Sequence, residues 1–316
     1  MTTTRDDAST VVCVLGAGSI GVAFAVVFAR AGFRVRMWDV YGDALARGQR
    51  EFDDKLAMLS GLSQADATNS TVRARVSWHV DLDEAVESAD LVQECIPEQL
   101  ALKRELFARL ASITHPDTVL ASSTSALKPG EIAAGCAAQE RILVGHPANP
   151  PFLLPVIEVV PSAFTAQRFA DRAAELYTRA GLKPIAVHRE VEGFVFNRLQ
   201  GALLREAYCL VRDGVASVAD IDDIVRLGVG RRWSVIGPFE TVDLNTRGGI
   251  ESHAQKMGPA YARMGAERGQ QDPWTDGLVQ EVTRQRRALL ALDDWDMRVR
   301  WRDEQLQRFL APSDGA

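Results

Sequence analysis

Residues 11 to 39 read VVCVLGAGSIGVAFAVVFARAGFRVRMWD, and this stretch decides how the chain begins to fold. The pattern predicts a short buried strand, a glycine-rich turn, an apolar helix and a second strand that ends at Asp39. The uncharged run from Val11 to Ala29 also approaches the length of a membrane span, but three glycines interrupt it. The sequence therefore favours a buried strand followed by a helix.

The three glycines of this turn each have a physical role in binding a dinucleotide. Gly16 permits the tight turn, Gly18 lets the backbone approach a pyrophosphate, and Gly21 lets helix and strand pack closely. The phosphates then meet the first residues of the helix, Ser19 and Ile20. Asp39 follows Gly21 by eighteen positions, where a carboxylate can accept hydrogen bonds from ribose hydroxyls. This arrangement predicts NAD as cofactor, in preference to NADP, although a glycine-rich turn in an ordinary α/β core stays the alternative.

The composition of the chain limits the classes of protein to which it can belong. The 316 residues suit two domains, and a net charge of −6 with 25% charged residues gives no basic surface for nucleic acid. The first ten residues have two acids and no apolar core, so neither a signal peptide nor a lipidation signal is expected. The four scattered cysteines indicate a reduced, cytoplasmic protein, and no Cys or His pair has the spacing of a metal site.

Strand and helix signals alternate beyond Asp39, which predicts a doubly wound, mostly parallel Rossmann sheet. One amphipathic helix is expected from Leu100 to Ile113, with Leu102, Leu106 and Leu110 on one face at a spacing of four. Strands are predicted near residues 76–80, 91–96, 118–122, 141–145, 156–160 and 184–187, and a helix near 165–180. From residue 192 onward only helical periodicity remains, ending in a charged helix near the C-terminus. We therefore expect a cofactor domain over residues 1–188 and an all-α domain over residues 189–316.

A histidine and a glutamate stand where they could perform chemistry together. His146 ends the apolar run RILVG, and Glu158 lies inside the apolar run VIEVV. A buried carboxylate needs a partner, and a histidine held by a carboxylate can serve as a general base. A purely structural ion pair is an equal alternative from these residues alone. Likewise, Asn197 reads as a core amide or a site residue, and Ser125 as a helix cap or a site hydroxyl.

Several motifs together resemble the 3-hydroxyacyl-CoA dehydrogenase superfamily, in its small-substrate branch with L-gulonate 3-dehydrogenase and lambda-crystallin. The matching segments are GAGSIG, ECIPEQLALKRELF, SSTSAL, GHPANPPFLLPVIEVV, EGFVFNRLQ, GVGRRWSVIGPFETVDLN and RWRDEQLQRF. The resemblance implies that His146 is the catalytic base, that Glu158 orients it, and that Ser125 and Asn197 hydrogen-bond the substrate oxygen near the nicotinamide. By the same resemblance, the further cofactor contacts are Glu98, Lys103, Ser125 and Asn149, although Lys103 also reads as a solvated helix charge.

The expected substrate is a small polar 3-hydroxy acid, with L-gulonate as the leading candidate. Enzymes of the superfamily that use acyl-CoA need basic groups along the helix after the second strand, whereas residues 43–55 carry three basic against four acidic side chains. The family match assigns Arg232 to the free carboxylate, which a guanidinium binds bidentately, with a surface or domain-interface charge as the alternative. A 3-hydroxybutyryl-CoA dehydrogenase is the alternative enzyme, and a non-catalytic NAD-binding protein is the alternative class. The resemblance also implies a homodimer formed through the helical domain.

Overall fold

The computed structural model describes residues 10–60, 68–234, 237–245 and 249–268, together with residues 277, 281, 284, 288, 291–294, 297, 300 and 304. These residues form two compact units, one that extends from the N-terminal part of the chain to Arg198 and one from Leu199 to Arg300. The expected charged helix near the C-terminus falls largely outside the described residues.

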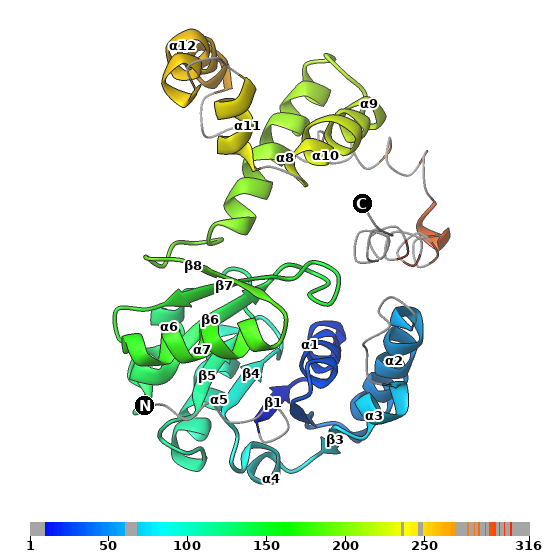
Figure 1. Ribbon diagram of the computed structural model, residues 1–316, viewed down its shortest axis with the longest axis vertical. Helices are drawn as coiled ribbons and strands as arrows, with labels where there is room; N and C mark the ends of the chain where they lie inside the picture. Colours follow the sequence, from blue (N-terminus) through cyan, green and yellow to red (C-terminus); the bar gives the residue numbers. More distant parts are fainter. Residues whose placement is uncertain are drawn as a thin grey trace. The chain divides into compact units, whose positions relative to one another are not determined.

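The first unit contains an eight-stranded sheet in the order β3-β2-β1-β4-β5-β6-β7-β8 (Figure 1). Its strands are β1 (Val11–Leu15), β2 (Arg34–Trp38), β3 (Val76–His79), β4 (Leu91–Glu94), β5 (Val119–Ser122), β6 (Ile142–Pro147), β7 (Val156–Pro161) and β8 (Lys183–Ala186). All neighbouring strands run parallel except β6 and β7, which pair antiparallel. The predicted doubly wound, mostly parallel sheet is confirmed.

Helices cover both faces of this sheet, as parallel strands require. They are α1 (Ser19–Arg30), α2 (Gly42–Leu59), α3 (Asn69–Arg73), α4 (Leu82–Val86), α5 (Leu100–Ile113), α6 (Pro129–Ala133), the short 3-10 helix η2 (Gln139–Arg141) and α7 (Gln167–Arg179). One hydrophobic cluster joins the sheet to α1, α2 and α7, and a second joins its other face to α4, α5 and α6. Because α1 is packed into this core, nine of its twelve residues are buried.

The antiparallel pairing of β7 with β6 determines which residues of these two strands lie opposite each other. Only eight residues separate β6 from β7, too few for the helical crossover that a parallel pair needs. The chain therefore folds straight back, and the resulting register sets His146 opposite Glu158. This hairpin-like return from β6 to β7 thus brings together two residues that are twelve positions apart in the sequence.

The face of α5 that carries the three leucines is only partly buried. The helix has the expected bounds, but its buried residues are Lys103, Phe107 and Leu110. Leu102 is 41% exposed, because this side of the helix borders a pocket and does not pack against the sheet. Leucine spacing alone could not distinguish a pocket wall from a core face, and a lysine was not expected at a core position.

The second unit is helical over its described residues. It contains most of α8 (Phe196–Arg212), α9 (Val218–Asp223), a π-helical turn (Ile224–Val229), α10 (Gly230–Trp233), α11 (Pro238–Asn245), α12 (Gly249–Arg268) and a 3-10 turn (Leu292–Asp294). The side chain of Ser217 caps α9 by accepting a hydrogen bond from the amide of Asp220. Arg268 of α12 pairs with Glu206 and Asp213, which ties the two long helices together. The predicted helical second domain is confirmed.

Candidate active site

The glycine-rich turn after β1 has a geometry in which two of its three glycines are required by packing. Gly16 has φ of +104°, and a Cβ there would lie 2.7 Å from the carbonyl oxygen of Cys95. At Gly21 a Cβ would lie 1.9 Å from the carbonyl oxygen of Gly16. A Cβ at Gly18 would meet no atom within 4 Å, so open space lies in front of the first residues of α1. A pyrophosphate can approach the backbone and the helix N-terminus at this point.

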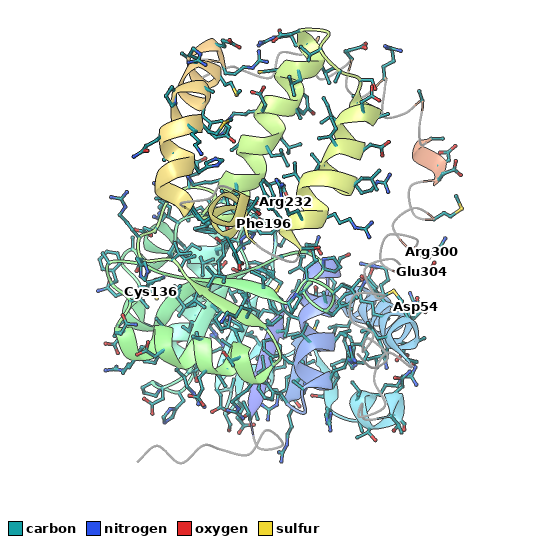
Figure 2. All side chains as sticks on the ribbon, turned by 45° about the horizontal axis from the view of Figure 1, so that its top comes forward. Asp54, Cys136, Phe196, Arg232, Arg300 and Glu304 are labelled. Carbon is teal, nitrogen blue, oxygen red and sulfur yellow. The ribbon has the colours of Figure 1, made fainter. Side chains whose placement is uncertain are left out.

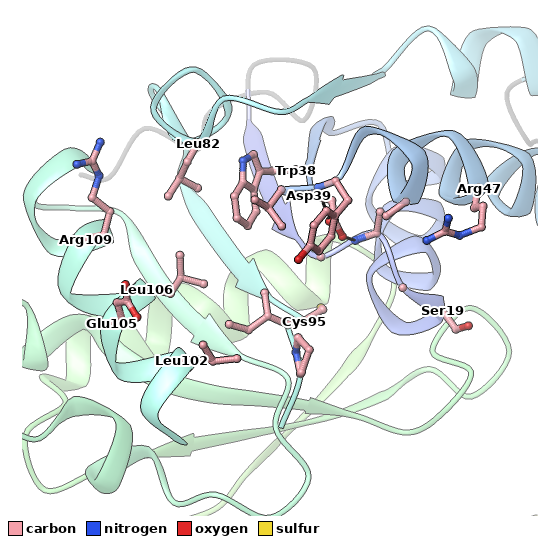
Figure 3. Close-up of a pocket in the computed structure, with 18 of the residues that line it drawn as sticks. Ser19, Trp38, Asp39, Arg47, Leu82, Cys95, Leu102, Glu105, Leu106 and Arg109 are labelled. Carbon is pink, nitrogen blue, oxygen red and sulfur yellow. Dashed lines mark hydrogen bonds between the residues drawn. The ribbon is translucent and has the colours of Figure 1, made fainter. Parts of the chain in front are cut away.

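A pocket of about 1020 Å³ adjoins this turn (Figure 3). Apolar side chains form much of its wall, among them Trp38, Leu82, Leu102 and Leu106. Asp39 lies at the end of β2, where its Oδ2 accepts a hydrogen bond of 2.9 Å from the amide of Ala17 and its Oδ1 one of 3.0 Å from the amide of Tyr41.

These bonds leave further lone pairs on both carboxylate oxygens, which can accept hydrogen bonds from ribose hydroxyls. The open space at Gly18, the carboxylate and the apolar wall therefore fit the phosphates, a ribose and the adenine of a dinucleotide. The chain itself shapes this fit, since any side chain at Gly16 or Gly21 would overlap with backbone.

His146 and Glu158 form a buried hydrogen-bonded pair across β6 and β7. His146 is 5% exposed and Glu158 3% exposed, and 2.7 Å separates Nδ1 of the histidine from Oε2 of the glutamate. The second carboxylate oxygen, Oε1, accepts hydrogen bonds from the amides of Val195 and Phe196 at 2.7 and 3.0 Å. The glutamate therefore has three donors around its two oxygens.

This set of donors fixes the ionisation of Glu158 and the tautomer of His146. Burial alone would raise the pKa of Glu158, but the hydrogen bonds from His146, Phe196 and Val195 outweigh it and lower the pKa below its ordinary value. An ionised carboxylate can only accept, so Nδ1 of His146 must carry its proton. In the neutral imidazole the lone pair then lies on Nε2, which is the atom that a general base uses.

Two phenylalanines at the start of α8 and just before it pack beside the imidazole. The ring centroids of Phe194 and Phe196 lie 5.5 and 6.3 Å from that of His146. Phe194 is fully buried with φ of +48°, an uncommon backbone conformation that follows Gly193 at +74°. The segment thus supplies amides to Glu158 and aromatic rings to His146 within three residues.

A second group of side chains surrounds the loop after β5 that carries Ser125. Asn197 donates a hydrogen bond of 3.0 Å from Nδ2 to the carbonyl oxygen of Ser125. Glu98 accepts from the amide of Ser125 at 3.0 Å and from the hydroxyl of Thr124. Partial burial would raise the pKa of Glu98, but the Thr124 hydrogen bond and the Lys103 charge lower it overall. The backbone of Ser125 is held on both sides, and its side chain is exposed.

The remaining predicted site residues lie in different surroundings. Lys103 is 1% exposed and pairs with Glu94, so it is not the solvated charge that was the alternative interpretation. Asn149 lies exposed in the loop after β6, before a cis bond to Pro150. Arg232 lies exposed on α10 of the second unit (Figure 2). The structure therefore brings together His146 with Glu158, and Ser125 with Asn197, Glu98 and Lys103.

Sequence reasoning missed two features of this region. The first is Glu94, which is fully buried at the end of β4. A related signal was present in the sequence, because Glu94 closes the predicted strand LVQE, much as Glu158 lies inside the apolar run VIEVV. The second is the pair of phenylalanines beside His146, which sequence spacing does not relate to β6.

Comparison with known proteins assigns both parts of the chain. The NAD-binding domain of 3-hydroxyacyl-CoA dehydrogenase matches residues 11–191, and the C-terminal domain of the same family matches residues 193–288. The chain belongs to the 3-hydroxyacyl-CoA dehydrogenase family. It is therefore an NAD-dependent oxidoreductase that acts on a CH–OH group, and the predicted cofactor is confirmed.

Relatives within the 3-hydroxyacyl-CoA dehydrogenase family resemble the chain over most of its length. A lambda-crystallin homolog of Bos taurus is 39% identical over 94% of each chain. An L-carnitine dehydrogenase of Streptomyces griseus is 40% identical over 88% of this chain and 80% of its own. A solved structure of an NAD-dependent 5-formyl-3-hydroxy-2-methylpyridine 4-carboxylic acid 5-dehydrogenase superposes with a TM-score of 0.79 at 26% identity, covering 95% of this chain and 98% of that one.

The described residues also bear on membrane insertion and metal binding. None of the described helices has the length and apolar character needed to cross a bilayer. Over the same part of the chain, no three His, Cys, Asp or Glu side chains are grouped as metal ligands.

Proposed function

We propose that this protein oxidises the 3-hydroxyl of a small polar 3-hydroxy acid, with L-gulonate as the leading candidate. The observation that carries the proposal is the buried 2.7 Å contact between His146 and Glu158. It leaves Nε2 of the imidazole as a proton acceptor, as a dehydrogenase of secondary alcohols requires.

In the proposed reaction, His146 removes the hydroxyl proton while the hydrogen on C3 leaves with its electron pair. Bound NAD supplies the acceptor for that hydride. The products are the 3-oxo acid, NADH and a proton on Nε2 of His146. Glu158 stabilises the resulting imidazolium through Nδ1, because a carboxylate beside a charged ring is favourable in a buried site.

Two further side chains are proposed to steady the carbonyl oxygen as it forms. The Ser125 hydroxyl is exposed beside the loop, and Asn197 keeps one amide hydrogen beyond its bond to the carbonyl of Ser125. Both are donors, which suits an oxygen that carries partial negative charge during the transfer.

The cofactor is proposed to lie along the turn and pocket described above. Gly16, Gly18, Ser19, Ile20 and Gly21 would hold the phosphates and Asp39 a ribose. The further cofactor contacts proposed are Glu98, Ser125 and Asn149, while Lys103, whose ammonium is buried, would act through Glu98.

The charges of α2 support a free acid over a CoA thioester. Arg47 pairs with Asp43 at 2.7 Å and Lys55 pairs with Glu51 at 3.0 Å. These two cations are neutralised within their own helix, and residues 43–55 carry one more acidic than basic side chain, so α2 presents no net positive charge to the phosphates of CoA. One relative is an L-carnitine dehydrogenase, and L-carnitine is a short 3-hydroxy acid that carries no CoA. Residues 61–67, which follow α2 and contain no basic side chain, lie outside the described residues.

Arg232 is proposed to bind the carboxylate of this acid. A guanidinium offers two parallel N–H donors to a carboxylate, and the loss of such a charged contact costs about 1.5–3 kcal/mol, roughly 10- to 100-fold in affinity. Arg231, the adjacent residue on α10, provides a matched comparison.

The test measures NADH formation from L-gulonate and from 3-hydroxybutyryl-CoA. We expect the free acid to be the better substrate by kcat/KM, and Arg232→Met to raise its KM at least about tenfold. Arg231→Met should change KM far less. A clear preference for the thioester, or an unchanged KM in Arg232→Met, would contradict the substrate assignment.

A cytoplasmic homodimer is also part of the proposal. Leu199, Leu203 and Leu204 of α8 are exposed apolar side chains, of the kind that a second copy of the chain would cover. Light scattering of the purified protein tests the dimer, and a monomer at micromolar concentration would contradict it.

A further inference from the structure

A fully buried ion pair lies beneath the loops that surround Ser125. Glu94 at the end of β4 is 0% exposed, Lys103 on α5 is 1% exposed, and 2.7 Å separates Nζ from Oε1. Removing two charges from water costs several kcal/mol per ion, and such pairs stabilise a fold no better than apolar side chains of the same volume. Stability alone therefore gives no reason for this pair.

The pair is hydrogen-bonded to backbone and side chains at the ends of two strands. Glu94 accepts from the amide of Ile96 at 2.7 Å and from the hydroxyl of Ser122 at 2.5 Å. Lys103 also donates to the carbonyl oxygen of Ile96 at 3.3 Å. Both backbone groups of Ile96 are thus fixed by the pair, directly before the segment that carries Glu98.

Lys103 extends the network to the loop after β5. Its Nζ lies 3.3 Å from Oε2 of Glu98, and Oε1 of Glu98 accepts from the amides of Ser125 and Ala126 at 3.0 and 3.3 Å. Asn197 holds the carbonyl oxygen of Ser125 from the other side. An unbroken chain of contacts therefore runs from Glu94 through Lys103 and Glu98 to the backbone of Ser125.

We propose that Glu94 and Lys103 are positioning residues that fix the Ser125 hydroxyl through Glu98, without touching substrate. The inference rests on the proposed function, since it gives the loop its catalytic purpose. Lys103 holds Glu98 in the orientation in which that carboxylate accepts the loop amides. Misplacing a donor by about 1 Å can lower a rate as much as 10²-fold, so a loosened loop is expected to lower kcat.

The first test separates positioning from stability. Lys103→Met leaves Glu94 buried without a cation, so the thermal midpoint should fall, and kcat at saturating NAD and substrate should fall about tenfold. In the double variant Glu94→Gln with Lys103→Met the midpoint should largely recover, whereas kcat should stay low because Glu98 still lacks its cation. Lys183→Met, which changes an exposed lysine on β8, is the matched control. Recovery of kcat together with the midpoint would overturn the inference.

A second measurement does not depend on activity. Amide hydrogen exchange in the peptide that spans residues 123–128 should be faster in Lys103→Met and in the double variant than in the wild type, while peptides from β1 stay unchanged. Unchanged exchange in residues 123–128 would overturn the inference even if kcat fell.

The last measurement tests whether the effect passes through Ser125. In a Ser125→Ala background, Lys103→Met should lower kcat less than twofold further, because the hydroxyl that it positions is gone. A full tenfold loss in that background would overturn the inference. Failure of the proposed function has a different signature, namely a wild type that turns over no 3-hydroxy acid at all.

Discussion

Replacing Glu158 with glutamine tests whether His146 is the general base. The change keeps the size of the side chain and alters only its hydrogen bond to His146. The glutamine keeps the shape of the side chain, and its carbonyl oxygen can still accept from the amides of Val195 and Phe196. The amide nitrogen then takes the place of Oε2, 2.7 Å from Nδ1 of His146. Two donors cannot share that contact, so His146 must move its proton to Nε2 and lose the lone pair that accepts the substrate proton.

The size of the effect follows from the loss of the base and of its counter-charge. General-base catalysis contributes roughly 10²–10⁴-fold, which corresponds to about 2.7–5.5 kcal/mol in the barrier. The transition state also forms an imidazolium, which a neutral amide does not stabilise as a carboxylate does. We therefore expect kcat to fall by at least about 10²-fold.

The assay follows NADH formation at saturating NAD and substrate in Glu158→Gln. Glu87→Gln is the matched control, because it changes an exposed glutamate of the same unit and should leave kcat within about twofold of the wild type. NADH binding, measured by fluorescence, should be little changed because Glu158 does not line the cofactor pocket. A kcat within tenfold of the wild type would refute the argument from the tautomer.

Two further predictions concern pH and cofactor choice. The folded-state pKa of Glu158 lies below its ordinary value of 4.5, so the unfolded state binds more protons at this group. The ionised carboxylate therefore stabilises the fold above about pH 4.5, and this stabilisation is lost as pH falls through the folded-state pKa. Urea unfolding should therefore show a difference between the wild type and Glu158→Gln that shrinks from pH 6 to pH 3.5, and a constant difference would count against the lowered pKa. Asp39→Asn keeps a hydrogen-bond acceptor but removes the charge that repels the 2′-phosphate of NADP. The ratio of kcat/KM with NADP to kcat/KM with NAD should therefore rise at least about tenfold. An unchanged ratio would show that Asp39 does not set the cofactor preference.

Local sequence patterns predicted the sheet because they reflect local physics. Apolar runs of four to six residues became buried strands within one or two residues of the expected ends, as at β5 and β7. The roles of Gly16 and Gly21 could be predicted because a side chain at either position would overlap with backbone, whereas a side chain at Gly18 would enter the open space in front of α1. The pairing of His146 with Glu158 was expected because an acid in an apolar strand requires a partner, and the structure contains that contact.

Features that depend on the shape of a pocket could not be predicted in this way. The side of α5 with Leu102 and Leu106 reads as core by its spacing, yet it borders the pocket. Lys103 reads as a surface charge, but two carboxylates, one of them on β4, make its burial possible. The aromatic neighbours of His146 come from the chain nearly fifty residues later, and only the fold brings them to β6. The domain boundary expected between residues 188 and 189, and the catalytic roles themselves, stay predictions.

Turnover of L-gulonate by His146→Ala tests the central claim most directly. The structure predicts that NADH formation at saturating NAD falls at least about 10²-fold while the dissociation constant of NADH changes little, because the imidazole lies outside the pocket beside Gly18. A His146→Ala variant that turns over at a near-normal rate would contradict the account, since no other residue is proposed to accept the proton.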